Sequence, residues 1–112
     1  MSNIFDAIVY ESVVSFVEAT KAKSDAYFGI HYTNLDPPTF EIKTGSKFHK
    51  IIRTSRSGVS RSVFAFVDKV TGDIFKPASW AAPAKHARGN VLNLDNGSSA
   101  VTPDGQGIFY LK

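Results

Sequence analysis

The chain has 112 residues, 43% of them hydrophobic and 21% charged, which is the size and composition of one folded domain and excludes a disordered chain. It has no cysteine, which excludes disulfides, thiolate catalysis and zinc–thiolate sites. Its net charge of +3 hides an uneven distribution: residues 43–88 hold ten of the thirteen Lys and Arg residues and only two acids, a formal charge of +8, and the rest of the chain carries −5.

The N-terminal part of the chain predicts an amphipathic helix over residues 4–22. Apolar residues recur there at spacings of three and four, which places them on one helix face. They are Ile4, Phe5, Ile8, Val9, Val13, Phe16 and Val17. Asn3 is suited to cap the first turn, and Lys21 and Lys23 suit the negative end of the helix dipole.

From residue 27 the period changes to two, which predicts a β-rich remainder, residues 27–111. The expected strands are residues 27–33, 40–44, 47–54, 62–70, 74–76, 91–94 and 108–111. Gly45 at the first central position predicts a type II′ turn, and Pro83 and Gly89 bracket a one-turn helix at residues 84–88. The predicted fold class is α+β, a single domain over residues 1–112, in which the helix packs on an antiparallel sheet of about five to six strands.

The alternation within two strands predicts what each sheet face carries. In residues 47–54, one face receives Phe48, Lys50, Ile52 and Thr54, and the other receives His49, Ile51 and Arg53. In residues 62–70, Phe64 and Phe66 are expected to share a face. Since neither face of the first strand is purely apolar, one is expected to be exposed and positive, as in several domains that bind RNA or single-stranded DNA. The aromatic signature of an RNA-recognition motif is absent.

Two other segments have a composition suited to phosphate or bases. The loop at residues 54–62 places Arg56 and Arg61 among hydroxyls around Gly58, although a solubilising hairpin tip is the commoner role of such loops. The proline-framed segment at residues 75–90 carries Lys76, Trp80, Lys85 and Arg88. Trp80 is suited to stack on a base, but large aromatic side chains more often pack in the core, which is the expectation here.

No motif predicts catalysis. The spacing of His31, His49 and His86 matches no metal-ligand pattern, so no catalytic residue, metal or cofactor is predicted. A metal-dependent nuclease site would have to be assembled across the fold from Asp68, Asp73 and His86. The N-terminus lacks the pattern of a signal peptide and no apolar run is long enough to span a membrane, so we expect a cytoplasmic protein without membrane contact.

Residues 61–90 carry a resemblance. The run Arg61-Ser62-Val63-Phe64-Ala65-Phe66-Val67-Asp68, followed by Gly72-Asp73-Ile74-Phe75-Lys76-Pro77-Ala78-Ser79-Trp80 and Ala82-Pro83-Ala84-Lys85-His86-Ala87-Arg88-Gly89, resembles small uncharacterised proteins of marine bacteriophages and other aquatic DNA viruses. The resemblance implies a viral protein in the host-cell cytoplasm that acts near nucleic acid, and it assigns no functional residue.

The leading hypothesis is a non-enzymatic basic domain that contacts nucleic acid. Its candidate binding residues are Lys50, Arg53, Arg56, Arg61, Lys76, Trp80, Lys85 and Arg88. The alternative is a structural or interaction module whose basic centre meets an acidic protein partner or the acidic ends of a second copy. The third hypothesis is a small metal-dependent nuclease.

Overall fold

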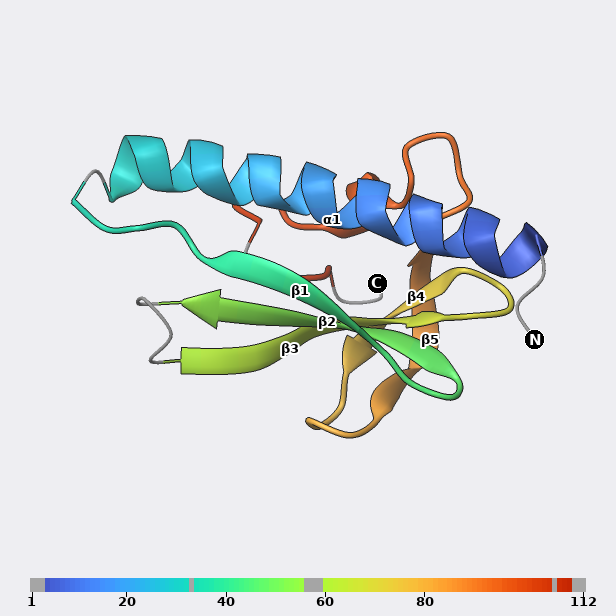
Figure 1. Ribbon diagram of the computed structural model, residues 1–112. Helices are drawn as coiled ribbons and strands as arrows, with labels where there is room; N and C mark the ends of the chain where they lie inside the picture. Colours follow the sequence, from blue (N-terminus) through green and yellow to red (C-terminus); the bar gives the residue numbers. More distant parts are fainter. Residues whose placement is uncertain (1–3, 33, 56–59, 106, 110–112) are drawn as a thin grey trace.

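The computed structural model describes residues 4–32, 34–55, 60–105 and 107–109. Across these residues one helix, α1 (Ile4–His31), lies over one face of a five-stranded antiparallel sheet (Figure 1). Each strand pairs with the next along the chain, so the sheet is a meander. The strands are β1 (Thr39–Thr44), β2 (Phe48–Ser55), β3 (Ser60–Asp68), β4 (Asp73–Pro77) and β5 (Pro83–Asn90). The predicted fold class, one N-terminal helix on an antiparallel sheet, is confirmed.

Helix α1 continues beyond its expected end at residue 22, and the predicted strand at residues 27–33 is wrong. Aromatic rings spaced four residues apart stack along the helix instead: the rings of Tyr27 and His31 are 4.2 Å apart, and those of Phe28 and Tyr32 are 5.0 Å apart. Such pairs stabilise a helix. A short run of alternating aromatic residues is compatible with the period of a strand and with that of a helix, so the pattern did not distinguish the two. Among the described residues, no helix combines the length and apolarity needed to cross a membrane.

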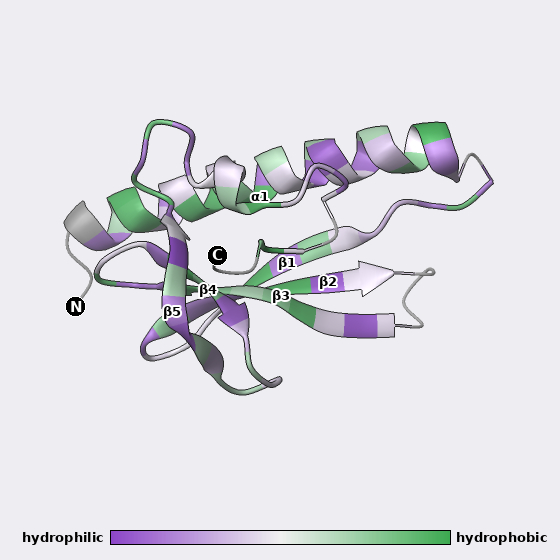
Figure 2. Ribbon diagram, turned by 180° about the vertical axis from the view of Figure 1, so that it is seen from behind, coloured by the Kyte–Doolittle hydropathy of each residue, from purple (hydrophilic) through white to green (hydrophobic). Residues whose placement is uncertain are grey.

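The hydrophobic core lies between α1 and the sheet. Figure 2 shows hydrophobic residues in the central parts of β2 and β3, beneath the helix. Among its described residues the helix contributes three fully buried apolar side chains, and β2, β3 and β4 contribute apolar side chains from their helix-facing sides. The core side chains of these elements include Val9, Val13, Phe16, Ile51, Ala65, Val67 and Ile74.

A β-bulge in β3 corrects one facing prediction. The register shift between β2 and β3 gives β3 one additional residue, Phe64. The ring of Phe64 lies on the helix side, 6.4 Å from the ring of Phe16, and the ring of Phe66 lies on the opposite face, 5.7 Å from that of Phe48. The expectation that Phe64 and Phe66 share a face is therefore wrong, because the inserted residue breaks the alternation.

The β1–β2 hairpin is confirmed, but its turn is not of type II′. Gly45 does not have the positive φ that this turn requires at its first central position. The two strands are joined by residues 45–47, and the Gly45 N–H donates to the Phe48 carbonyl oxygen at 2.9 Å. A connection longer than two residues removes the need for that conformation.

The expected short helix at residues 84–88 is instead strand β5. Pro83 pairs with Pro77 at the end of the β4–β5 ladder, where the missing N–H of proline is least costly. A proline therefore fits the start of a strand as well as the start of a helix. A segment with room for only one helical turn gains more hydrogen bonds by pairing with β4.

The chain after β5, residues 91–109 (the C-terminal segment), packs beside α1 (Figure 1). The predicted strand at residues 91–94 is a turn region, and within the expected strand at 108–111 Ile108 forms only an isolated bridge with Val101. Residues 110 and 111 lie outside the described residues. The Lys23 ammonium group donates to the carbonyl oxygens of Ser98 at 2.7 Å and Val101 at 3.1 Å, which ties the segment to the helix.

Candidate nucleic-acid interface

The sheet face turned away from α1, here called the open face, carries a row of cationic and aromatic side chains. Lys43, Lys50, Phe66 and Phe75 are paired across β1 to β4, so they share this face. Phe48 adjoins the row, its ring centroid 5.7 Å from that of Phe66 and 6.1 Å from that of Phe75. The predicted alternation along β2 is thus confirmed, and it leaves an aromatic floor edged by lysines.

The β4–β5 hairpin bends beneath the open face and carries Trp80 at its tip (Figure 1). The tip is closed by the backbone N–H groups of Ala78 and Ser79, which donate to the Ala82 carbonyl oxygen at 2.9 and 3.1 Å. Trp80 is 48% exposed. The expectation that Trp80 packs in the core is wrong, because the hairpin places it on the far side of the sheet from α1.

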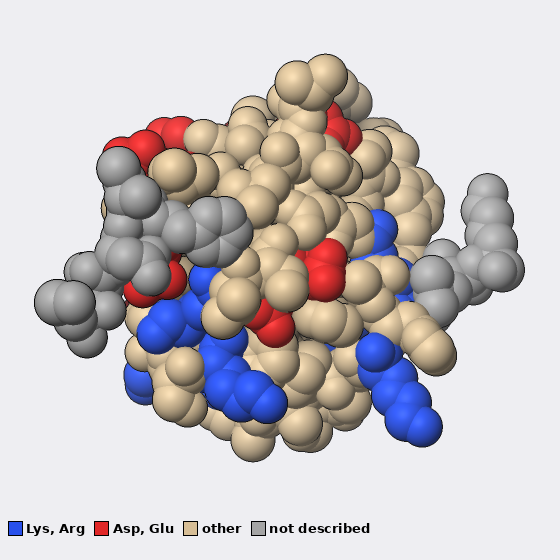
Figure 3. All heavy atoms as spheres, turned by 90° about the vertical axis from the view of Figure 1, so that its right-hand side faces the viewer, with Lys and Arg blue, Asp and Glu red and all other residues tan. Residues whose placement is uncertain are grey.

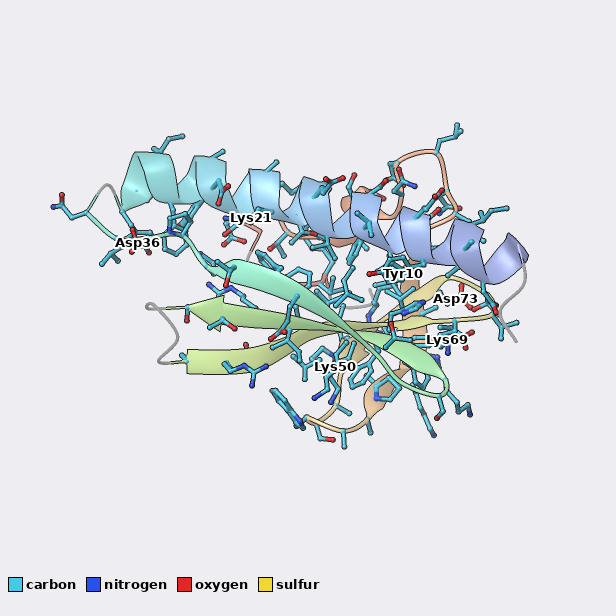
Figure 4. The ribbon with its side chains drawn as sticks, in the orientation of Figure 1. Tyr10, Lys21, Asp36, Lys50, Lys69 and Asp73 are labelled. Atoms are coloured by element: carbon cyan, nitrogen blue, oxygen red, sulfur yellow. The ribbon has the colours of Figure 1, made fainter. Side chains whose placement is uncertain are left out.

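Two cations lie within cation–π range of the Trp80 ring. The Lys50 Nζ atom is 4.7 Å from the ring centroid and the Arg61 Cζ atom is 5.8 Å from it. Lys50 Nζ is also 5.7 Å from the centroid of Phe66. Figure 4 shows Lys50 on the side of the sheet turned away from α1. Arg61 in addition pairs with Glu41, with 2.7 Å between Nη2 and Oε1, and both side chains are about half exposed. The indole therefore lies in a positive environment that remains open to solvent.

A groove of about 400 Å³ lies on the open face between the β1–β2 turn and the tip of the β4–β5 hairpin. This volume falls within the range of small-ligand sites. Three lysines line it, together with two aromatic rings and four small residues: Lys43, Lys47, Lys50, Phe48, Phe66, Thr44, Gly45, Ser46 and Ala81. In Figure 3 the charged side chains at the bottom of the view, the side of the open face, are Lys and Arg, and those at the top are Asp and Glu.

Of the eight residues predicted to bind, the structure brings Lys50, Arg61 and Trp80 together. Arg56 lies outside the described residues. Lys85 and Arg88 lie on the edge strand β5, where Arg88 Nη1 donates to the His86 carbonyl oxygen at 2.6 Å. Among the described side chains, neither of these two residues contacts the Trp80 indole, so both lie outside the cluster.

Arg53 and Lys76 lie away from this cluster. Arg53 pairs with Phe40, which packs against the core, so its side chain is on the helix side of the sheet. Burial lowers the pKa of Arg53, and the nearby Asp104 opposes that shift. The Lys76 ammonium donates to the Ile108 carbonyl oxygen at 2.7 Å, which holds the C-terminal segment.

The prediction of the site did not include Lys43 and Lys47, although both lie in the basic segment. Their signal was present in the sequence: in a hairpin turning at residues 45–47, odd-numbered Lys43 faces the same side as even-numbered Lys50 across the turn. Lys47 belongs to the turn itself, so only the folded hairpin shows that it lines the groove.

Two of the three residues considered for a nuclease, Asp68 and Asp73, hold turns and strand ends through hydrogen bonds. Asp68 Oδ1 accepts hydrogen bonds from the backbone N–H groups of Val70 at 2.7 Å and Thr71 at 2.9 Å, and Asp73 Oδ1 accepts one from Asn90 Nδ2 at 3.0 Å. Within the described part of the chain, no three His, Asp or Glu side chains are grouped so as to hold a metal ion. The geometry described therefore gives the nuclease hypothesis no support.

No curated protein and no solved structure matches the chain. One family model does match, over residues 9–111, which includes nearly all of α1 and the complete sheet. Its description is "Family of unknown function (DUF7717)". Because the match spans almost the full length, this protein belongs to the family DUF7717.

Proposed function

We propose that this protein is a non-enzymatic nucleic-acid-binding domain that contacts phosphates through its open face. The observation that carries the proposal is a cationic surface in two adjoining parts: Lys43, Lys47 and Lys50 line the groove, and Lys50 and Arg61 lie over an exposed Trp80. Cations grouped on one surface can neutralise several phosphates and release their counterions, and that release is the main source of sequence-independent affinity. Exposed aromatic rings between cations are typical of surfaces that follow a nucleic-acid backbone.

The test is fluorescence anisotropy with labelled DNA and RNA oligonucleotides between about 50 and 200 mM salt. Four phosphate contacts predict a slope of log K against log salt of about −3 for a single strand, since each contributes about −0.7. Lys43→Gln and Lys50→Gln should each make the slope shallower. Lys21→Gln, which removes the same charge from α1, is the matched control and should leave it unchanged. Absence of binding at 50 mM salt, or an affinity independent of salt, would contradict the proposal.

A second function is favoured by the opposite layer of the molecule. Glu11, Glu18 and Asp25 recur every seven residues along the exposed side of α1, so they form one acidic line, in which Asp25 is paired with Lys21. The acidic line and the basic open face lie on opposite sides of the fold, an arrangement suited to head-to-tail association of two copies. Light scattering tests it: association should weaken as salt rises, and a monomer at every salt concentration would exclude it.

A further inference from the structure

We infer that the nucleic acid bound by the open face is single-stranded, with an unpaired base stacked on Trp80 and an adjoining phosphate in the lysine groove. This inference rests on the proposed function and adds the class of ligand and the role of each part of the site. Phosphate contacts alone do not distinguish one strand from two, so the distinction has to come from the exposed indole.

Trp80 is presented in a way that allows stacking. It is 48% exposed at the tip of a hairpin whose backbone is held by two hydrogen bonds to the Ala82 carbonyl oxygen. Lys50 and Arg61 lie over the ring, so a base would stack on the part of the indole that remains exposed, and the two cations would attract its phosphates. By contrast, Phe66 is only 3% exposed, so it forms the floor of the groove and cannot serve as a stacking surface.

The indole and the groove adjoin each other through two residues. Lys50 lines the groove, and its Nζ atom is also 4.7 Å from the Trp80 ring. Ala81, the residue after Trp80, forms part of the groove wall. Lys43 and Lys47 supply two further ammonium groups at the other wall. A base on the indole therefore places its own backbone next to a cavity lined by three cations.

A duplex cannot use this arrangement fully. Its bases are stacked inside the helix, and their faces become accessible only when the bases are unstacked and unpaired, at a considerable cost. A single strand offers those faces freely, and sequence-tolerant stacking on aromatic side chains is its usual mode of recognition. The duplex should therefore bind through phosphates alone and more weakly.

Three ligands of equal length separate these contributions at about 50 mM salt: a single strand, its duplex, and an abasic strand that has the phosphates without the bases. We expect the single strand to bind about tenfold more tightly than either of the other two, as one stacked base predicts. Trp80→Ala should remove that preference, whereas Trp80→Phe, which keeps an aromatic ring, should retain most of it. Trp80 is the sole tryptophan, so its fluorescence should be quenched by the single strand and not by the abasic strand.

The outcomes distinguish the inference from the proposed function. Equal, salt-dependent binding of all three ligands, unaffected by Trp80→Ala, would overturn the inference and leave the proposed function standing. No binding of any ligand at low salt would overturn both. Circular dichroism of the Trp80 variants checks that the fold is intact, which a half-exposed position at a hairpin tip makes the expected result.

Discussion

Replacing Gly105 with alanine should weaken the attachment of the C-terminal segment to α1. Gly105 is buried and has φ +71°, a conformation that residues with a Cβ atom rarely adopt. A Cβ atom placed there would lie 2.6 Å from the backbone nitrogen of Ser24 and 2.9 Å from its Cα atom. Both are helix backbone atoms, which cannot move aside as the end of a side chain could, so either the loop or the helix must shift.

The size of the effect follows from two contributions. The left-handed conformation costs a residue with a Cβ atom about 1–2 kcal/mol, and overpacking against a rigid neighbour costs about 1–3 kcal/mol. Gly105→Ala should therefore lower the free energy of unfolding by about 2–5 kcal/mol, a large share of the roughly 5–15 kcal/mol that stabilises a small domain.

Urea denaturation followed by circular dichroism measures this change. At about 1–3 kcal/mol per M, the midpoint should fall by about 1 M or more. Gly107→Ala is the matched control in the same loop, because its added Cβ atom meets nothing within 4 Å and its φ is not in the left-handed region. It should leave stability unchanged or raise it by about 0.4–1 kcal/mol. Equal midpoints for the two variants would refute the reasoning.

Three further predictions concern charged and titratable groups. Burial, and to a lesser degree Lys69, lowers the pKa of His49, so the unfolded state binds more protons than the folded state and stability should be lost as pH falls below about 6.5. The urea midpoint should therefore fall between pH 7.5 and pH 5, and it should fall less in His49→Gln than in the unaltered protein. Glu41→Gln breaks an exposed ion pair with Arg61, so the free energy of unfolding, measured by thermal denaturation, should change by less than about 1 kcal/mol. Because the substitution removes a negative charge beside Arg61, fluorescence anisotropy should show up to about fivefold tighter binding of single-stranded DNA. Lys23→Gln removes two hydrogen bonds to the C-terminal segment and should cost about 1–3 kcal/mol in urea denaturation.

Each of these three has a discriminating comparison. His86→Gln changes an exposed histidine, and the histidine argument fails if it alters the acid sensitivity as much as His49→Gln does. If Glu41→Gln weakens DNA binding, the open face does not hold phosphates near Arg61. Lys21→Gln removes an exposed ion pair with Asp25 and one long hydrogen bond, 3.3 Å, to the Pro38 carbonyl oxygen, so it should cost about 1 kcal/mol or less, and a loss equal to that of Lys23→Gln would contradict the assigned role of Lys23.

Local periodicity was sufficient for part of this structure. The three- and four-residue spacing of apolar side chains predicted the first part of α1, and the alternation in β2 correctly separated Lys50 from Arg53. Both patterns depend only on backbone geometry within one element, which neighbouring residues in the chain determine. The sequence could therefore place Lys50 and Arg53 on opposite faces, but it did not say which of the two faces is exposed.

Other features depended on contacts between elements. Ring stacking extended the helix through residues 27–31, pairing with β4 turned residues 83–90 into a strand, and one bulge moved Phe64 to the core side. The distribution of the basic residues of segment 43–88 over the two faces of the sheet also depended on contacts between elements. The face that a cation occupies is set by strand register and by how the β4–β5 hairpin bends.

The sequence by itself determined the helix-on-sheet class and the excess of positive charge in residues 43–88, since composition and periodicity are local properties. Only the tertiary structure decided which cations meet. It placed Lys43, Lys47 and Lys50 of the β1–β2 hairpin along one groove, and it brought Lys50 and Arg61, the latter from β3, to Trp80 at the tip of the β4–β5 hairpin. The physical reason is that convergence on one surface is set by pairing and sheet curvature over long sequence separations, which no local pattern encodes.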